Sequence, residues 1–236
     1  MNKIIGLIPA RAGSKRIKNK NIKLLNGKPL IAYTIKAASK SILIDATIVS
    51  TNSVKIAMLS KKYCSAKIPF MRPTKYAQDN SSDISVMKHC IDEINLHSSD
   101  LIVYLRPTTP FKTAFLIDHC IRLLANSPQF TCIRTISKIT GNNHPYWMFK
   151  KNEDKLEPFI TGIDMQQYHQ SQLLPECFKV NGVVDVFKVS EVLKGNQYGN
   201  KIGYVEITER YRDIDIDTEE DLLFCEYLLK NNLIKI

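Results

Sequence analysis

The sequence predicts an α/β fold in which a mostly parallel sheet is flanked by helices. Runs rich in Ile, Val and Leu alternate with amphipathic stretches along most of the 236 residues. These runs are continuously apolar, as in strands that are covered on both faces. The composition is 44% hydrophobic with nine glycines and ten prolines, which is typical of a globular protein with a sizeable core. We therefore expect a single domain over residues 1–236.

The predicted elements follow one another as strand and helix. The apolar runs predict strands at residues 4–10, 46–51, 68–71, 101–105, 130–136, 180–189 and 201–207. Apolar residues at helical spacing predict helices at residues 29–39, 54–63, 83–96, 114–125 and 219–229. Thr218 should cap the start of the last helix, with Asp221 completing a variant of the capping box. Because open α/β sheets bind ligands at the carboxyl ends of their strands, residues 9–21 should lie at the ligand-binding edge.

Residues 141–177 interrupt this alternation. The segment contains Pro145-Tyr146-Trp147 and several glutamines in place of a strand or helix pattern. We interpret it as an excursion inserted into the domain, outside the main sheet. His144, which precedes the aromatic pair, is a candidate for approaching the substrate.

Charge and cysteine content exclude several classes of protein. Lys and Arg number 33 against 23 Asp and Glu, a net charge of +10 that permits a nucleic-acid partner. A basic stripe interleaved with aromatic residues is missing, so we expect no nucleic-acid partner. The six cysteines form no C-x-x-C pair, which argues against a zinc site, a redox motif or a disulfide scaffold and indicates small buried side chains. The apolar runs are too short for a signal peptide or a membrane span, so we expect a cytoplasmic protein without a membrane partner.

A basic loop follows the first predicted strand, with the sequence Pro9-Ala10-Arg11-Ala12-Gly13-Ser14-Lys15-Arg16. Small residues let the backbone approach a ligand, and Arg11 and Lys15 can neutralise phosphate charge. The spacing differs from that of a Walker A motif, because Lys15 does not directly follow a glycine. The loop therefore predicts a triphosphate site, with a solvated basic turn as the alternative.

An acidic segment precedes the last predicted helix. Asp213, Asp215 and Asp217 alternate with Ile214 and Ile216, and alternate residues of an extended segment share a face. The isoleucines should anchor the segment in the core and leave the carboxylates on the other side. Paired carboxylates are suited to Mg²⁺, which usually retains waters and binds substrate phosphates. The alternative is a helix start decorated with acids, which suits Glu219 and Glu220 better than Asp215 and Asp217.

Together these motifs resemble the opening and the closing segments of the acylneuraminate cytidylyltransferases, also called CMP-sialic acid synthetases. The likeness covers nearly the whole chain and is weak only in the excursion. It is carried by residues 7–16, 18–22, 26–30, 49–51, 72–73, 77–82, 106–110, 181–182 and 214–218.

The resemblance implies a nucleotide-diphospho-sugar transferase fold, CTP and Mg²⁺ as co-substrate and cofactor, and a homodimer formed through the excursion. It implies that Arg11, Ser14 and Lys15 hold the triphosphate and that Lys20 and Asn21 complete the nucleotide site. Positions that match the cytosine contacts are Arg72 and Ser81, and those that match the metal ligands are Asp215 and Asp217. Arg11, Lys15 and Asp215 are the residues expected to carry catalysis. On the sugar side the candidates are Arg106, Thr108, Gln172, Asn181 and Asp185.

Several departures from the family pattern lie on the sugar side. Asn52 stands where many relatives have aspartate, and Arg106 stands where glutamine is common. Gln170-Ser171-Gln172 replaces an arginine-rich stretch, and Asp185 replaces an aromatic residue. A nine-carbon acid such as legionaminate or pseudaminate is therefore expected at least as much as sialic acid itself.

The expected reaction is attack by the anomeric hydroxyl of a 2-keto-3-deoxy sugar acid on the α-phosphorus of CTP. It needs positioning and electrostatic stabilisation but no enzyme nucleophile. Alternatives are a cytidylyltransferase for an eight-carbon acid, a glycosyltransferase that uses a nucleotide-sugar, and a non-catalytic nucleotide sensor.

Overall fold

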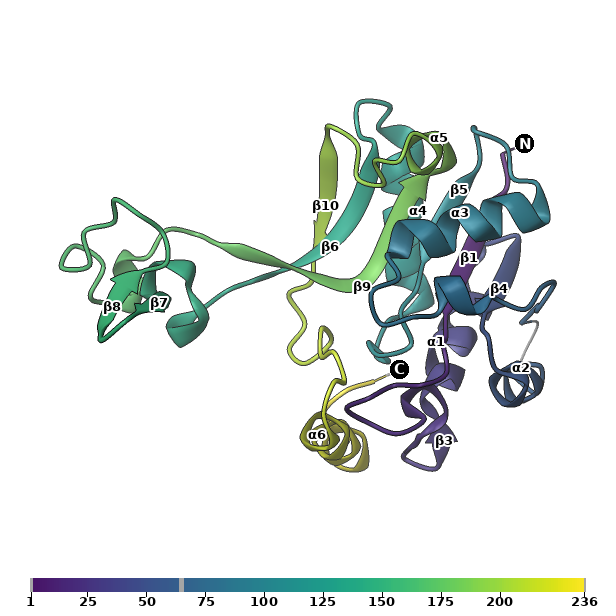
Figure 1. The fold of residues 1–236 in the computed structure, drawn as a ribbon, viewed down its shortest axis with the longest axis horizontal. Coiled ribbons are helices and arrows are strands. Elements are labelled where there is room, and N and C mark those ends of the chain that lie inside the picture. Colours follow the sequence, from purple (N-terminus) through teal and green to yellow (C-terminus); the bar gives the residue numbers. More distant parts are fainter. Residues whose placement is uncertain (1, 64–65, 236) are drawn as a thin grey trace.

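The computed structural model describes residues 2–63 and 66–235. A six-stranded sheet crosses the molecule in the order β10-β6-β9-β5-β1-β4, as Figure 1 shows. The strands are β1 (Ile4–Pro9), β4 (Ala46–Ser50), β5 (Leu101–Tyr104), β6 (Cys132–Lys138), β9 (Phe178–Lys188) and β10 (Ile202–Glu206). The predicted α/β fold with a mostly parallel sheet is confirmed.

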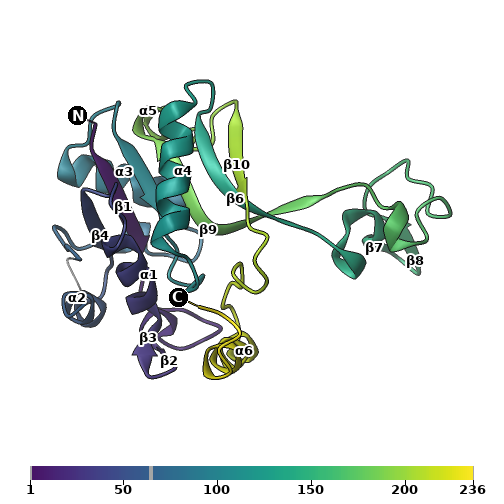
Figure 2. The same ribbon diagram turned by 180° about the vertical axis from the view of Figure 1, so that it is seen from behind.

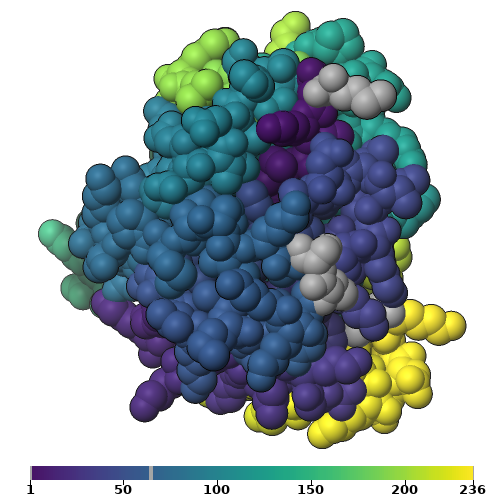
Figure 3. Space-filling model, turned by 90° about the vertical axis from the view of Figure 1, so that its right-hand side faces the viewer, coloured from purple at the N-terminus to yellow at the C-terminus, as the bar shows by residue number. Residues whose placement is uncertain are grey.

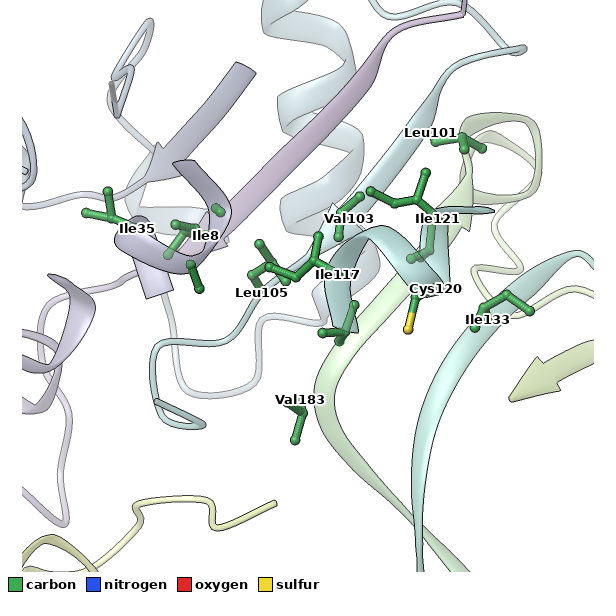
Figure 4. Close-up of a cluster of buried hydrophobic side chains, with 14 of the residues drawn as sticks. Ile8, Ile35, Leu101, Val103, Leu105, Ile117, Cys120, Ile121, Ile133 and Val183 are labelled. Atoms are coloured by element: carbon green, nitrogen blue, oxygen red, sulfur yellow. The ribbon is translucent and has the colours of Figure 1, made fainter. Parts of the chain in front are cut away.

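Helices cover both faces of the sheet because the strands are apolar on both sides. On β5, Leu101 and Val103 pack into one core cluster, whereas Ile102 and Tyr104 pack into another. The first cluster lies under α1 (Leu30–Ser39), α2 (Val54–Ser60) and α4 (Ala114–Asn126), and Figure 4 shows its centre between β5 and α4. The second lies under α3 (Asp83–Ile94) and α5 (Val189–Leu193). Figure 2 shows α1 and α4 on the face opposite α3.

One prediction about the strands needs correction, and one strand runs in a direction that the sequence did not predict. Residues 68–71 form no strand, and the only bridge that the described part of this region makes joins Lys67 to Ile48. The strand at residues 178–188 is antiparallel to both of its neighbours, β5 and β6. It returns from the excursion between two strands that run the other way.

The excursion is an arm that projects from the sheet. Figure 1 shows the ends of β6 and β9 leading out to it side by side. At its end lie a hairpin of β7 (Phe149–Asn152) and β8 (Lys155–Pro158) and three short 3₁₀ turns, at Gly141–Asn143, Pro145–Trp147 and Ser171–Leu173. The structure therefore places residues 141–177 outside the sheet, as expected, and their part in a dimer stays a prediction.

The N-terminal and C-terminal regions share a third core cluster. Ile17 and Leu25, which lie around the small hairpin of β2 (Leu24–Leu25) and β3 (Lys28–Pro29), pack with Ile216, Leu222 and Leu228. Figure 3 shows the yellow C-terminal residues beside the purple and blue N-terminal third. The last helix, α6 (Glu219–Lys230), begins with the predicted capping box of Thr218 and Asp221. This packing holds the acidic segment against the first loop.

The cysteine prediction is confirmed for Cys90, Cys120, Cys132 and Cys225, which are buried free thiols. Cys177 is half-buried, and Cys64 lies outside the described residues. Within residues 2–63 and 66–235, helices long and apolar enough for a membrane span are missing.

Candidate active site

The basic loop is built from the carboxyl end of β1. Ala10 N–H donates to the Ser50 carbonyl at 2.9 Å, and Ala12 N–H donates to the Asn52 side chain at 2.8 Å. The buried Asn21 side chain donates to the Arg11 carbonyl at 2.9 Å, which closes the loop on itself. Gly13 has a φ of +82°, a left-handed conformation that glycine adopts without strain. The backbone is thus fixed while the cationic side chains remain accessible.

A cavity of about 380 Å³ opens beside this loop. It combines residues from the two ends of the chain, since Asp217 faces the basic loop across it. The lining consists of Arg11, Ser14, Lys15, Arg16, Lys20, Asn21, Asp79, Thr108 and Asp217. All five residues predicted to hold the triphosphate and complete the nucleotide site therefore surround one space.

The acidic segment is extended and anchored as predicted. Ile216 is fully buried, and its N–H donates to the Thr108 carbonyl at 2.8 Å. Lys20 Nζ donates to the Ile216 carbonyl and to Asp217 Oδ1, both at 2.9 Å. The segment is therefore held between the basic loop and the turn that follows β5.

The three aspartates have different partners. Asp217 also pairs with Arg16 at 2.7 Å, whereas Asp213 pairs with Lys179 at 3.0 Å. Asp215 is exposed, and within the described residues it makes no ion pair shorter than 4.0 Å. The part of the chain that the structure describes contains no cluster of three or more His, Cys, Asp or Glu side chains suited to a metal. Two carboxylates are nevertheless a fitting donor set for Mg²⁺, which takes its other ligands from water and substrate phosphates.

A second cavity, of about 190 Å³, adjoins the first and shares Arg11, Asp79 and Thr108 with it. Both residues predicted to contact cytosine line it. Arg72 is buried and donates to Ser50 Oγ at 3.0 Å, to the Ser50 carbonyl and to the Tyr76 carbonyl. Burial lowers the pKa of this guanidinium, although nearby Tyr104 opposes the effect. Arg72 therefore shapes the wall of the cavity as well as facing it.

Asp79 joins the two cavities. Its carboxylate lies 2.7 Å from Arg11 and also pairs with Lys15. Hydrogen bonds from Lys15 and then Arg11 hold the pKa of Asp79 below its ordinary value. The carboxylate thus contacts the two cations that we assign to the triphosphate. No role was predicted for Asp79, and Asn52 was expected on the sugar side. The structure shows that both contact the basic loop, which is distant from them in the sequence.

A row of charges connects the second cavity to the base of the arm. Tyr104 donates to Asp83 at 2.8 Å, and Arg106 bridges Asp83 at 2.6 Å and Asp185 at 2.7 Å. Arg134 also donates to Asp185, at 3.0 Å through Nε. Burial alone would lower the pKa of Arg106, but Asp185 and then Asp83 raise it. Arg106 is therefore a stable cation at this position.

The structure separates the residues predicted for the sugar side. Arg106 and Thr108 line the second cavity. Asp185 is fully buried, so it holds Arg106 and Arg134 in place instead of presenting a free carboxylate to a ligand. Asn181 bonds Thr135 and Ser137 at the base of the arm, and Gln172 is exposed on the arm itself.

His144 does not face either cavity. The side chain is 2% exposed, contacts the Pro175 carbonyl at 3.0 Å and accepts a hydrogen bond from Tyr146 N–H. The expectation that it approaches the substrate is therefore wrong for this chain, and its role is to fold the arm.

Another hollow, of about 450 Å³, lies elsewhere, between α1 and the start of α4. None of the predicted site residues lines it. We therefore assign the chemistry to the two smaller cavities at the carboxyl ends of β1 and β5, where the charged groups converge.

Comparison with known proteins agrees with this geometry. A family described as cytidylyltransferase matches residues 5–194, most of the chain. The chain belongs to the cytidylyltransferase family. It is therefore a nucleotidyltransferase, as the sequence motifs predicted.

Relatives of this cytidylyltransferase include a CMP-N,N'-diacetyllegionaminic acid synthase from Legionella pneumophila, which is 30% identical over 98% of this chain and 97% of its own length. An N-acylneuraminate cytidylyltransferase from Escherichia coli is 27% identical over 93% of this chain, which spans only half of that longer protein. The solved structure of CMP:2-keto-3-deoxy-manno-octonic acid synthetase with CTP superposes with a TM-score of 0.71 over 98% of this chain and all of that one. At 14% identity, this last likeness shows the fold.

Proposed function

We propose that this cytidylyltransferase transfers CMP from CTP to the anomeric hydroxyl of a nine-carbon 2-keto-3-deoxy sugar acid and releases pyrophosphate. The observation that carries the proposal is the convergence of the basic loop and the acidic segment on one cavity, where Lys20 joins Asp217. Cations on one side suit the phosphates, and the carboxylates of the acidic segment would suit a Mg²⁺ ion that neutralises phosphate charge. The adjoining smaller cavity is of a size for the base.

The reaction forms one bond between the anomeric oxygen and the α-phosphorus and breaks the bond between the α-phosphorus and the β-phosphate oxygen. The hydroxyl proton passes to solvent, and pyrophosphate leaves with the bonding electrons. Arg11 and Lys15 stabilise the charge that develops on the phosphates and the leaving group. Because they are paired with Asp79, the triphosphate must replace that carboxylate.

We propose Asp215 and Asp217 as the ligands of a Mg²⁺ ion. When bound, the ion would supply further charge neutralisation to the phosphates. Asp217 is already paired with Arg16 and Lys20, so these cations keep its carboxylate oriented toward the basic loop.

The names of the relatives favour the nine-carbon class of acid, since one synthesises a legionaminic acid derivative and another acts on N-acylneuraminate. Arg106 lies between the second, smaller cavity and the arm. The exposed part of its side chain can face a carboxylate or a hydroxyl of the sugar acid. The eight-carbon acid is the competing substrate.

We further propose a cytoplasmic homodimer formed through the arm. Several large apolar side chains of the arm are exposed in the single chain, which is unusual for a monomer surface. They include Met148, Phe149, Leu156, Phe159 and Leu173. A second copy of the arm would cover such a surface.

The test is pyrophosphate release by the purified protein with CTP, Mg²⁺ and a panel of acids. The panel contains N-acetylneuraminate, a legionaminate, a pseudaminate and the eight-carbon 3-deoxy-manno-octulosonate, and mass spectrometry identifies the CMP-sugar. We expect the highest kcat/KM with one of the nine-carbon acids and little turnover with UTP or ATP. A preference for the eight-carbon acid would contradict the proposed substrate class. If no acid led to pyrophosphate release, the proposed reaction itself would be wrong.

A further inference from the structure

Lys112 is buried two residues before α4 begins and lines neither cavity of the site. Its side chain is 2% exposed. Nζ donates to the Arg106 carbonyl at 2.8 Å, to Thr109 Oγ1 at 3.0 Å, to Thr34 Oγ1 at 3.2 Å and to the Thr109 carbonyl. Such complete pairing is what a buried amine needs, because an unpaired polar group in the interior is costly.

The partners of Lys112 define the turn that follows β5. Thr109 N–H donates to the Arg106 carbonyl at 3.4 Å, and the Thr109 hydroxyl donates to the same carbonyl at 3.2 Å. Lys112 adds a donor from inside the turn and ties it to Thr34 of α1. Residues 106–109 are therefore held by side chains, since no strand or helix includes them.

This turn is hydrogen-bonded to the acidic segment. The Thr108 carbonyl accepts from Ile216 N–H at 2.8 Å, and Thr108 also lines both cavities. Lys112 thus lies two contacts away from Asp215 and Asp217. Burial, and then Arg106, lower the pKa of Lys112 to about 7, whereas Asp215 acts in the opposite direction, which agrees with the proximity of that carboxylate.

Lys112 makes no ion pair with the described carboxylates, so charge pairing does not explain its burial. A hydrophobic residue of similar length would fill the space but would leave the carbonyls at positions 106 and 109 without this donor. We propose that Lys112 is a positioning residue that fixes the turn at residues 106–109 and, through it, holds the acidic segment in place for Mg²⁺. The role of the segment rests on the proposed function, but the positioning itself does not.

The test compares variants that remove hydrogen bonds of the Lys112 ammonium with variants that keep them. Lys112→Met removes the donor, and Thr109→Val removes one acceptor while keeping the shape of the side chain. Thr109→Ser retains the hydroxyl and is the matched control. Asp118→Asn disturbs a buried carboxylate on α4, which accepts hydrogen bonds from Ser41 and Ile42, and controls for a general loss of stability.

The first readout needs no activity. Hydrogen exchange of the Ile216 amide, without substrate, should be about tenfold faster in Lys112→Met and Thr109→Val, which corresponds to one lost hydrogen bond. It should stay at the wild-type rate in Thr109→Ser and Asp118→Asn. The second readout is the Mg²⁺ concentration for half-maximal pyrophosphate release, which should rise by about the same factor in the first two variants only.

If Lys112→Met does not fold, the comparison of Thr109→Val with Thr109→Ser tests the proposal. Unchanged exchange at Ile216 in a folded Lys112→Met or Thr109→Val variant would overturn the proposal, as would equal effects of Thr109→Ser or Asp118→Asn. Should wild type release no pyrophosphate, the proposed function fails while the exchange readout still decides the role of Lys112.

Discussion

The ammonium of Lys20 lies 2.9 Å from the carboxylate of Asp217, and this ion pair closes one side of the larger cavity. Lys20 is mostly shielded from solvent, with 15% of its side chain exposed, so the contact is stronger than an ordinary surface pair. Lys20 thus holds the acidic segment in place, and we propose that it also binds phosphate.

Lys20→Met should lower kcat/KM for CTP by about 10- to 100-fold, because a charge-assisted hydrogen bond contributes about 1.5–3 kcal/mol. Steady-state pyrophosphate release at varied CTP measures the effect. Lys18→Met is the matched control, since Lys18 is an exposed cation of the same loop and does not line the cavity. Equal losses in the two variants would show that only the net charge of the loop matters.

Asp215→Ala should lose most of its turnover, about 100-fold or more, while remaining folded, because this carboxylate is exposed and is assigned to the metal. The loss should be greatest at limiting Mg²⁺. Asp213→Ala is the control, since Asp213 belongs to the same acidic segment but pairs with Lys179 and is not assigned to the metal. Near-normal turnover of Asp215→Ala at limiting Mg²⁺ would contradict the assignment.

Asp185→Asn should destabilise the fold by about 3–5 kcal/mol, because it removes the buried carboxylate that two partly buried guanidinium groups share. Urea unfolding measures this change. Asp83→Asn removes the other partner of Arg106, but Asp83 is 38% exposed, so the expected cost is no more than ~1 kcal/mol. A small effect of Asp185→Asn would mean that water reaches the buried charges.

The stability of the protein should fall as the pH drops below about 6.5, the ordinary pKa of histidine. His89 is buried between Phe70 and Tyr76, and its Nδ1 has no partner in the described structure. Burial lowers its pKa, while Glu93 and Asp92 oppose the effect and Arg72 and Lys75 add to it. The unfolded chain therefore takes up the proton first, so acid favours unfolding.

His89→Phe keeps an aromatic ring at this position and removes the titration. Thermal unfolding of both proteins at pH 5.5 and 7.5 should show a larger loss for wild type. Parallel pH profiles would exclude His89 as the cause.

Leu156→Glu should convert the proposed dimer into monomers, because it places a charge on the most exposed large apolar residue of the arm, at 71%. Sedimentation velocity distinguishes the two states. Leu223→Glu is the control, since Leu223 is 64% exposed on α6, away from the arm. A monomeric wild type would refute the dimer directly.

The sequence predicted the strands and helices of the sheet because each has a strong local period. It did not reveal that β9 is antiparallel, since a strand buried on both faces has the same apolar pattern in either direction. Residues 68–71 have the composition of a strand but do not pair with the sheet. The neighbouring Lys67 forms an isolated β-bridge with Ile48 of β4. Pairing depends on neighbours that a local pattern does not contain.

The candidate site was predictable where its residues form short motifs. Arg11, Lys15 and Asp217 meet as expected. The contacts of Asp79, Asn52 and Lys112 escaped prediction because each residue acts on a segment distant in the chain, or through backbone carbonyls that any sequence provides. The burial of Asp185 was equally invisible, since an aspartate in a strand reveals neither of its two arginine partners.

The packing of the acidic segment against the first loop has a consequence for synthesis on the ribosome. All six strands of the sheet precede residue 207, so a nascent chain can form its sheet and both flanking helix layers before the second wall of the larger cavity exists. A chain that ended just after β10 would contain the six strands but would lack both proposed metal ligands, together with Ile216, Leu222 and Leu228, against which Ile17 and Leu25 pack.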